Sequence, residues 1–347
     1  MPSGSITGWG HYAPKRVVTN HELETYMDTS DEWIRSRSGI RERRFAADDE
    51  TTATMSVESG RRALHSAGVA PSEVDLLLVA SSSPDHITPP VSSQVQEGLG
   101  LPSVGAMQLT VGCTGFLYAV VTADQFIQAG TCRTVLVIGT ELTSRWLSWN
   151  NRSTAVLFGD GSGAVVMQAT DDPSAGMRGH ILGSDGAGAE HIIVPTGGVA
   201  EPVTHEGIER GEPTLEMNGR EVFKFATRIM HQAVTEALDA ADCTVSDIDL
   251  LVPHQANARI IQYAADALGL VDDQVVMNLD RYGNTSAASI PLALSEALNE
   301  GRAEPGDTLA FVAFGAGLTW GATVMDLPDP LPALQNTSDT DAARVPA

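Results

Sequence analysis

Short, nearly continuous apolar runs alternate along this chain with longer segments whose apolar residues recur at helical spacing. The runs at 134–141 ("TVLVIGTE") and 308–317 ("TLAFVAFGAG") contain few polar residues, as expected for strands that are covered on both faces. A third run, at 250–252, breaks at Pro253, and an apolar helical segment begins soon after it. This alternation predicts an α/β protein whose sheets are largely buried.

Two passages of the chain align with each other without gaps. "ALHSAGVAPSEVDLLLVASSS" starts at Ala63, "ALDAADCTVSDIDLLVPHQAN" starts at Ala237, and identical pairs such as Asp75 and Asp249 are 174 residues apart. Each passage predicts a helix, a short turn and a buried strand. Any two αβ units share such features, but the constant offset favours an internal duplication. A glycine turn recurs later in each half, in "FGDGSGAVVM" and "FGAGLTWGATVM", and supports the same interpretation.

The duplication predicts two similar halves, at 1–172 and 173–327, each with strands and helices around its own sheet. The glycine- and proline-rich stretch 183–213 is expected to loop over the surface. The tail, 328–347, has few large apolar residues and is predicted to be disordered.

Composition and charge narrow the classes of protein that remain. The 347 residues carry a net charge of −23, which argues against nucleic acid or an anionic membrane as a partner. No apolar run approaches the roughly 20 residues that span a bilayer, and the first residues lack a signal-peptide pattern. The three cysteines show neither metal-site nor disulfide spacing, and the nine histidines form no H-x-x-x-H pair. We expect a cytoplasmic protein with reduced thiols and no metal.

One cysteine stands where a predicted strand gives way to a helix. In "AMQLTVGCTGFLYAVV" the strand runs into Gly112 and Cys113, which places the thiol at a helix N-terminus, where the dipole favours a thiolate. A small buried hydrophobe is the commoner fate of a cysteine. Gly112 and Gly115 favour a functional role, because they let another group approach the sulfur closely. Cys132 and Cys243 lack this setting and are assigned to packing.

Two further polar residues stand near the ends of predicted elements. His254 follows the buried run at 250–252, and Asn284 lies in the turn of "DRYGNTSAASIPLALSEAL", before an Ala-rich helix. Each alone would be assigned to a turn or a helix cap. Together with Cys113 they form a set that papain-type proteases also use, but the local cysteine signature of those enzymes is absent.

Four motifs, in the order "GCTGF", "VPHQANARII", "YGNTSAAS" and "FGAGLTWG", resemble β-ketoacyl-acyl-carrier-protein synthase III of the thiolase superfamily. "TSDEWIRSRSGIRERRF" and "MNGREVFKF" add to the resemblance, which covers the chain from about Gly8 to Asp326. It implies a duplicated thiolase-like fold with five αβαβα layers, and a homodimer. Asn284 separates this family from elongating synthases, which have a second histidine in that role.

The resemblance implies that Cys113, His254 and Asn284 share one active site. Cys113 would attack a thioester and hold the acyl group. His254 and Asn284 would each donate a hydrogen bond to the enolate oxygen that forms when a malonyl thioester loses carbon dioxide. Backbone N–H groups of Cys113 and of Ala316 would hold the carbonyl oxygen of the acyl group. No cofactor is implied beyond coenzyme A thioesters as substrates.

The same resemblance implies a coenzyme A site. Trp33 would stack on the adenine, and Arg37 and Arg152 would bind the adenine and phosphates. Gly219 and Asn257 would touch the pantetheine arm. Without the resemblance, the arginines would be assigned to surface charge and Trp33 to a half-buried anchor.

Two features depart from the pattern of the family. Thr88 stands where a bulky residue often gates the primer pocket, which predicts room for a primer longer or bulkier than acetyl. Acyl carrier protein is acidic, so a chain with a charge of −23 should repel it unless a basic patch dominates locally. Lys224 falls in the expected docking region together with Arg220, Arg228 and Arg259.

The predicted function is the condensation of an acyl-CoA primer with malonyl-acyl carrier protein, which initiates fatty-acid or polyketide synthesis. One alternative is a pathway-specific relative that uses a different acceptor or extender; Thr88 and the sparse basic patch keep it open. A second alternative, of a different class, is a non-catalytic partner subunit that binds coenzyme A or the carrier. The presence of Cys113, His254 and Asn284 argues against it.

Overall fold

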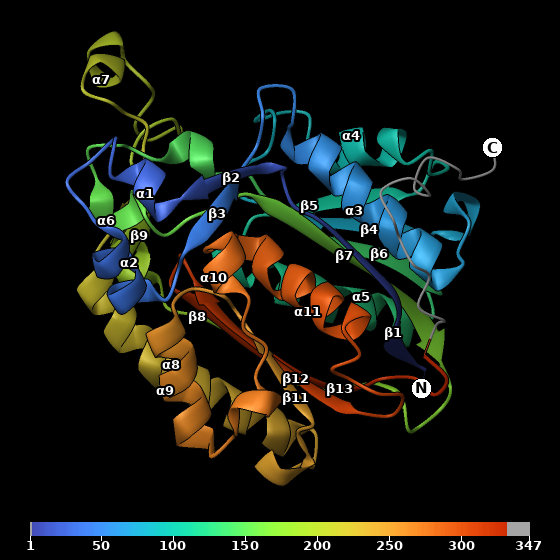
Figure 1. Ribbon diagram of the computed structural model, residues 1–347. Helices are drawn as coiled ribbons and strands as arrows, with labels where there is room; N and C mark the ends of the chain where they lie inside the picture. Colours follow the sequence, from blue (N-terminus) through green and yellow to red (C-terminus); the bar gives the residue numbers. More distant parts are fainter. Residues whose placement is uncertain (1, 332–347) are drawn as a thin grey trace.

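The computed structural model describes residues 2–331, and these form five layers (Figure 1). Two β-sheets lie face to face, with helices between them and further helices on both outer faces. The fold predicted from the sequence, a duplicated αβαβα arrangement, is confirmed. None of the helices in residues 2–331 is long and apolar enough to cross a membrane.

The first sheet has five strands in the order β1-β7-β6-β4-β5. Strands β4, β5 and β6 are parallel to one another, whereas β7 runs antiparallel to both β6 and β1. The bounds are β1 Ser3–Tyr12, β4 Leu76–Ala80, β5 Gly105–Leu109, β6 Thr134–Glu141 and β7 Gly161–Thr170.

The second sheet repeats this arrangement with four strands in the order β11-β12-β13-β8. Strands β11 and β12 are parallel, as β4 and β6 are, and β13 runs antiparallel to both β12 and β8. The bounds are β8 Gly176–Ser184, β11 Leu250–Pro253, β12 Thr308–Gly315 and β13 Thr319–Asp326.

The helices occupy three layers. Helices α5 and α11 lie between the two sheets, α3 and α4 cover the outer face of the first sheet, and α8 and α9 cover the outer face of the second (Figure 1). The bounds are α3 Thr52–Ala67, α4 Val91–Gly98, α5 Gly115–Gln128, α8 Gly219–Ala240, α9 Ala258–Leu268 and α11 Ser289–Asn299.

Strand β4 shows why the apolar runs are continuous. Leu76 and Leu78 pack into the core between the two sheets, whereas Leu77 and Val79 pack under α3 and α4. Successive side chains of a strand point to opposite faces, so a sheet covered on both faces needs apolar residues at every position. Complete burial of each such side chain contributes about 1.5–3 kcal/mol.

The offset of 174 residues extends well beyond the aligned passages. The 3₁₀ turn η2 (Gly112–Thr114) corresponds to η7 (Ser286–Ala288), and β6 and β12 begin at matching threonines. The backbone N–H groups of Asp75 and Asp249 donate to the carbonyl oxygens of those threonines, at 2.9 and 3.0 Å. The boundary between residues 172 and 173 falls between β7 and β8, and we retain it as a proposal.

The stretch 183–213 differs from its prediction. It contains the end of β8, a 3₁₀ turn and β9, and Ile192, Ile193 and Val194 line the main cavity rather than the outer surface. Helix α7, in the same stretch, projects away from the body of the molecule (Figure 1). Of the predicted tail only 328–331 are described, so the prediction for the rest lies outside the described residues.

The remaining elements are short. Their bounds are α1 Asn20–Leu23, α2 Asp31–Ser38, α6 Arg152–Ala155, α7 His205–Glu209, α10 Leu279–Tyr282, β2 Arg16–Thr19, β3 Glu42–Phe45, β9 Ile192–Ile193, β10 Glu216–Met217, η1 Pro71–Glu73, η3 Thr143–Trp146, η4 Gly186–His191, η5 Val245–Asp247 and η6 Asp272–Gln274.

Candidate active site

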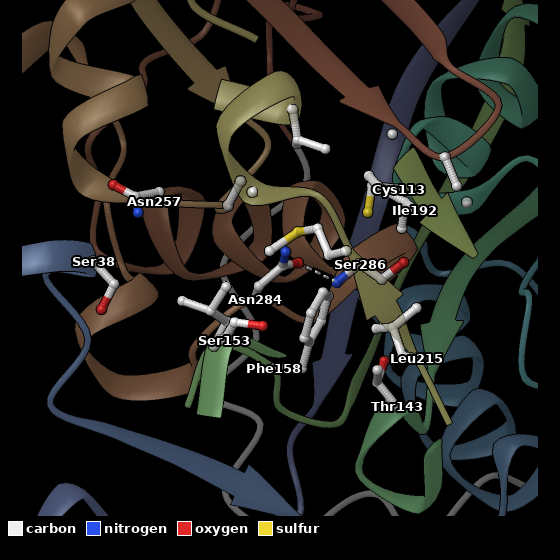
Figure 2. A pocket seen from close by; sticks show the side chains of 18 of the residues that line it. Ser38, Cys113, Thr143, Ser153, Phe158, Ile192, Leu215, Asn257, Asn284 and Ser286 are labelled. Atoms are coloured by element: carbon white, nitrogen blue, oxygen red, sulfur yellow. Dashed lines mark hydrogen bonds between the residues drawn. The ribbon is translucent and has the colours of Figure 1, made fainter. Parts of the chain in front are cut away.

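The ends of strands from both sheets line a cavity of about 640 Å³. Cys113 follows β5, Glu141 ends β6, His254 follows β11, and Gly315 ends β12; all four residues line the cavity, as does Asn284. Figure 2 shows Cys113, Asn284 and Phe158 with their side chains directed into this space. The structure therefore brings together the three residues that the sequence selected.

The backbone around Cys113 is packed too closely for side chains at its neighbours. Gly112 has a φ of +56°, and a Cβ there would lie 3.2 Å from the backbone nitrogen of Ala316. A Cβ at Gly315 would lie 2.8 Å from the backbone nitrogen of Cys113. The glycines are thus required for close approach of the β12–β13 turn to Cys113, and they place Ala316 beside it.

The protonation state of Cys113 differs from the expectation. The residue precedes α5, as predicted, but burial raises the pKa of its thiol to about 12, and the negative charge of Glu141 acts in the same direction. A hydrogen bond with Ser286 opposes the shift. The resting cysteine is therefore a neutral thiol, because desolvation outweighs the helix N-terminus.

His254 is almost completely buried, with 1% of its surface exposed. Its Nδ1 lies 2.6 Å from Ser289 Oγ, and the Gln255 N–H donates to the same oxygen at 3.3 Å. Since Ser289 Oγ already accepts one hydrogen bond, the arrangement favours donation of its own proton to Nδ1, which puts the imidazole proton on Nε2. Burial lowers the pKa of His254 to about 3, so the ring is neutral at pH 7.

Asn284 is held by contacts at both ends. Its backbone N–H donates to the Leu157 carbonyl oxygen at 2.8 Å, and its carbonyl oxygen accepts from the Gly159 N–H at 3.0 Å. In the side chain, Oδ1 accepts the N–H of Ser286 at 2.8 Å, the bond drawn in Figure 2. A backbone N–H can only donate, so this bond fixes Oδ1 and leaves Nδ2 as the donor toward the cavity.

The sequence did not lead us to two further candidate residues, Glu141 and Ser286. Glu141 has 2% of its surface exposed, and Ser286 adopts a left-handed φ of +50°, which is unusual for a residue with a side chain. An acidic residue at the end of an otherwise apolar strand run was the available signal for Glu141. Nothing in the sequence indicates the conformation of Ser286.

The mouth of the cavity contains most of the predicted coenzyme A residues. Trp33, Arg37, Gly219 and Asn257 line the cavity, and the Arg152 guanidinium lies 4.8 Å from the centre of the Trp33 ring without lining it. Asn257 also caps α9: its Oδ1 accepts the Arg259 N–H, and its Nδ2 donates to the Arg37 carbonyl oxygen.

The basic residues lie beside this mouth. Arg220, Lys224 and Arg228 are exposed along one face of α8, at a spacing of about one helical turn. The exposed Arg259 guanidinium lies 5.5 Å from the centre of the Phe223 ring, and Phe223 lines the cavity. The four residues thus form a basic face at the edge of the cavity.

Thr88 is not brought to the cavity within a single chain. It is exposed in the segment after β4, next to Ile87, which is 93% exposed, and it does not line the cavity. Cys132 and Cys243 are buried and free, as predicted. In the described part of the chain, no three His, Cys, Asp or Glu side chains gather closely enough to hold a metal ion.

Known proteins resemble this chain over nearly all of its length. Residues 107–186 match the family model described as 3-oxoacyl-[acyl-carrier-protein (ACP)] synthase III, and residues 238–327 match its C-terminal counterpart. The β-ketoacyl-[acyl-carrier-protein] synthase III of Symbiobacterium thermophilum is 49% identical over 320 residues, which cover 92% of this chain and 97% of that protein.

Solved structures of this family resemble the chain over the same length. The β-ketoacyl-[acyl carrier protein] synthase III of Thermus thermophilus has a TM-score of 0.86 and 45% identity, covering 92% of this chain and 98% of that one. The priming β-ketosynthase of the R1128 polyketide pathway has a TM-score of 0.86 and 37% identity, covering 94% and 97%. The chain therefore belongs to the β-ketoacyl-[acyl-carrier-protein] synthase III family.

Proposed function

We propose that this protein catalyses the decarboxylative condensation of an acyl-CoA primer with malonyl-acyl carrier protein. The acyl group passes through a thioester on Cys113, and the product is a β-ketoacyl-acyl carrier protein. The observation that carries the proposal is the convergence of Cys113, His254 and Asn284 in one cavity of a chain that belongs to this family.

In the first half-reaction Cys113 attacks the acyl-CoA thioester and coenzyme A leaves. This divides one difficult acyl transfer into two easier steps. The backbone N–H groups of Cys113 and Ala316 stabilise the oxyanion that forms on the acyl carbonyl. The close approach of the β12–β13 turn to Cys113 supports this assignment.

In the second half-reaction the malonyl thioester loses carbon dioxide, and the resulting enolate attacks the acyl-cysteine. His254 Nε2 and Asn284 Nδ2 donate hydrogen bonds to the enolate oxygen. Support comes from the bonds to Ser289 and Ser286, which direct these two donors into the cavity. Fixed donors require little reorganisation as the negative charge develops.

Substrates enter at the mouth described above. Trp33 and Arg152 hold the adenine, Arg37 binds phosphate, and Gly219 and Asn257 contact pantetheine. The carrier docks on the basic face formed by Arg220, Lys224, Arg228 and Arg259; three arginines supply its positive charge, and Lys224 is paired with Glu221 at 2.7 Å. The chemistry uses side chains and thioesters alone and calls for no cofactor.

A homodimer and a cytoplasmic location are part of the proposal. β5 is an edge strand of the first sheet and Met107 on it is 37% exposed, so a second copy has an edge on which to pair. For Thr88 to act at the primer pocket, a second copy must supply it. The three free cysteines suit a reducing compartment.

A pathway-specific role, such as polyketide priming with an unusual acceptor or extender, remains the second candidate. It is favoured by the structural likeness to the priming β-ketosynthase of the R1128 pathway and by the small Thr88. The two candidates differ in the primer and the carrier, and not in the three central residues.

Intact-mass spectrometry after incubation with acyl-CoAs of graded length and branching tests the proposal. We expect an acyl adduct that disappears in Cys113→Ala and that is lost again on addition of malonyl-acyl carrier protein. A preference for acetyl-CoA by a wide margin contradicts the prediction for Thr88. The absence of an adduct with every acyl-CoA contradicts the function, and would favour carrier-bound donors or a non-catalytic partner subunit.

A further inference from the structure

A buried carboxylate lies in the wall of the cavity that holds the nucleophile, and the proposed chemistry does not use it. Glu141 ends β6, lines the cavity beside Cys113, and accepts hydrogen bonds from four residues. A buried charge is costly unless hydrogen bonds satisfy it. The donors around Glu141 therefore allow an ionised carboxylate in this buried position.

The donors divide unequally between the two oxygens of Glu141. Oε1 accepts from Ser81 Oγ (3.0 Å), the Ser82 N–H (2.6 Å), the Ser83 N–H (3.0 Å) and Ser83 Oγ (2.9 Å). Among residues 2–331, only Ser286 donates to Oε2, through its Oγ at 2.7 Å. Since Oε1 is surrounded by donors, a proton that arrives on this carboxylate must bind Oε2, on the side of Ser286.

Ser286 connects this oxygen to the nucleophile. Its hydroxyl bonds to Glu141 Oε2, and its backbone N–H holds Asn284 (Figure 2). Ser286 and Cys113 line the same cavity, on the neighbouring turns η7 and η2. A hydroxyl has one proton. When that proton is donated to an ionised Glu141, the oxygen of Ser286 can only accept from Cys113 S–H. The three groups then form a chain of donors that runs from sulfur to carboxylate.

We propose that Glu141, acting through the Ser286 hydroxyl, is the positioning residue that takes up the thiol proton of Cys113 during acylation. The S–H bond breaks as sulfur attacks the thioester; that proton passes to Ser286 Oγ, and the proton of Ser286 passes to Glu141 Oε2. The departing coenzyme A thiolate takes a proton from water. When condensation releases the cysteine thiolate, the transfer runs in reverse, and Glu141 is ionised again.

The electrostatics of the site suit this role. Burial raises the pKa of Glu141, which makes the carboxylate a better proton acceptor than an exposed one, and hydrogen bonds from Ser286, Ser82, Ser83 and Ser81 oppose the shift. His254 is a poor alternative, because burial lowers its pKa to about 3 and Ser289 bonds its Nδ1.

The structure offers matched variants. Glu141→Gln keeps the shape and removes the acceptor. Ser286→Gly removes the hydroxyl, retains the backbone N–H that holds Asn284, and suits a φ of +50°. Thr140→Val is the control: Thr140 is buried next to Glu141, and its Oγ1 has no hydrogen-bond partner in the described part of the chain. Adjacent strand residues point to opposite faces.

The measurement is the rate at which Cys113 is modified, as a function of pH, by iodoacetamide and by acetyl-CoA. With an internal acceptor, the rate in the unaltered protein and in Thr140→Val stays level between about pH 7 and pH 9. In Glu141→Gln and Ser286→Gly the proton must leave to solvent, so the rate rises about tenfold per pH unit and recovers at high pH.

Two results would overturn the proposal: a level profile in either variant, or slow modification at every pH without recovery, which indicates a merely structural role. Thermal unfolding confirms that each variant is folded, and either variant alone decides the question. The relay rests on the proposed acyl-cysteine, but iodoacetamide needs no thioester. Failure of acetyl-CoA and longer acyl-CoAs to label the protein therefore contradicts the proposed function, while the iodoacetamide profile still decides the relay.

Discussion

Ser289 provides a direct test of how His254 is oriented. The substitution Ser289→Ala removes the hydroxyl that lies 2.6 Å from His254 Nδ1 and leaves this nitrogen buried without its partner. The Ser289 hydroxyl favours the tautomer with the proton on Nε2, because it donates to Nδ1. Without this hydroxyl the neutral ring can also carry its proton on Nδ1. The proposed donor to the enolate is weakened, whereas the acylation chemistry at Cys113 is left intact.

The size of the effect follows from the burial of the site. Loss of one partner of a buried hydrogen bond costs about 1–3 kcal/mol, and complete loss of an oxyanion donor costs about 3 kcal/mol, which sets the upper limit. A barrier higher by 1–3 kcal/mol slows decarboxylation by a factor of about 5 to 150. Acylation of Cys113 should change by less than about twofold, since the proposed mechanism gives His254 no part in that step.

The assay separates the two half-reactions. Acyl transfer from acyl-CoA to Cys113 is followed by intact mass, and release of carbon dioxide from malonyl-acyl carrier protein is followed separately. The control is Ser295→Ala on the same helix: Ser295 Oγ lies 2.9 Å from His11 Nδ1 and is likewise buried, but neither residue lines the cavity. Unchanged decarboxylation in Ser289→Ala, or an equal loss in both half-reactions, would refute the assignment of the tautomer.

Three further predictions follow from the site. Arg152→Ala should raise the KM for acyl-CoA about tenfold with little change in the maximal acylation rate, because one stacking cation contributes about 1 kcal/mol or somewhat more; steady-state kinetics with a fixed carrier concentration decides it. Gly315→Ala places a methyl group 2.8 Å from the backbone nitrogen of Cys113, so acylation should fall at least a hundredfold, whereas Ala316→Ser should be tolerated, as intact-mass labelling will show. The third concerns acid: burial lowers the pKa of His254 from 6.5 to about 3, so the unfolded chain binds a proton that the folded protein excludes, and stability falls as the pH drops below about 6.5. The melting temperature of His254→Asn should therefore fall less steeply than that of the unaltered protein as the pH drops below about 6.5. An identical dependence of melting temperature on pH in the two proteins would contradict the burial of a neutral ring.

Much of the fold was accessible from the sequence because its signals are local or periodic. The continuous runs at β4, β6 and β12 follow from burial on both faces, and the constant offset between Ala63 and Ala237 follows from the duplication. His254 stands directly after β11, and Cys113 stands in the 3₁₀ turn that follows β5. In α/β proteins, functional groups commonly lie at the carboxyl ends of parallel strands. These residues could be selected without knowledge of any contact between the halves.

The rest depends on contacts between distant parts of the chain. Glu141 and Ser286 are 145 residues apart, and only the folded chain shows that one carboxylate oxygen faces the serine. The thiol of Cys113 was expected to ionise because a helix N-terminus can be recognised in a sequence, whereas the desolvation that outweighs it cannot. The stretch 183–213 has the composition of a surface loop, yet it contributes Ile192 and its neighbours to the cavity.

The duplication also explains why the site cannot be assigned to either half. At the offset of 174 residues, the proposed nucleophile Cys113 corresponds to Ala287, and His254 corresponds to Ala80. Both alanines flank Gly115 at the start of α5, where a Cβ on the glycine would lie 3.1 and 3.7 Å from their methyl groups. Each half thus has an alanine at the position where the other half has Cys113 or His254, and the two small side chains pack beside Gly115. The two halves resemble each other in fold and differ at these positions, so neither half alone contains all the residues that line the site.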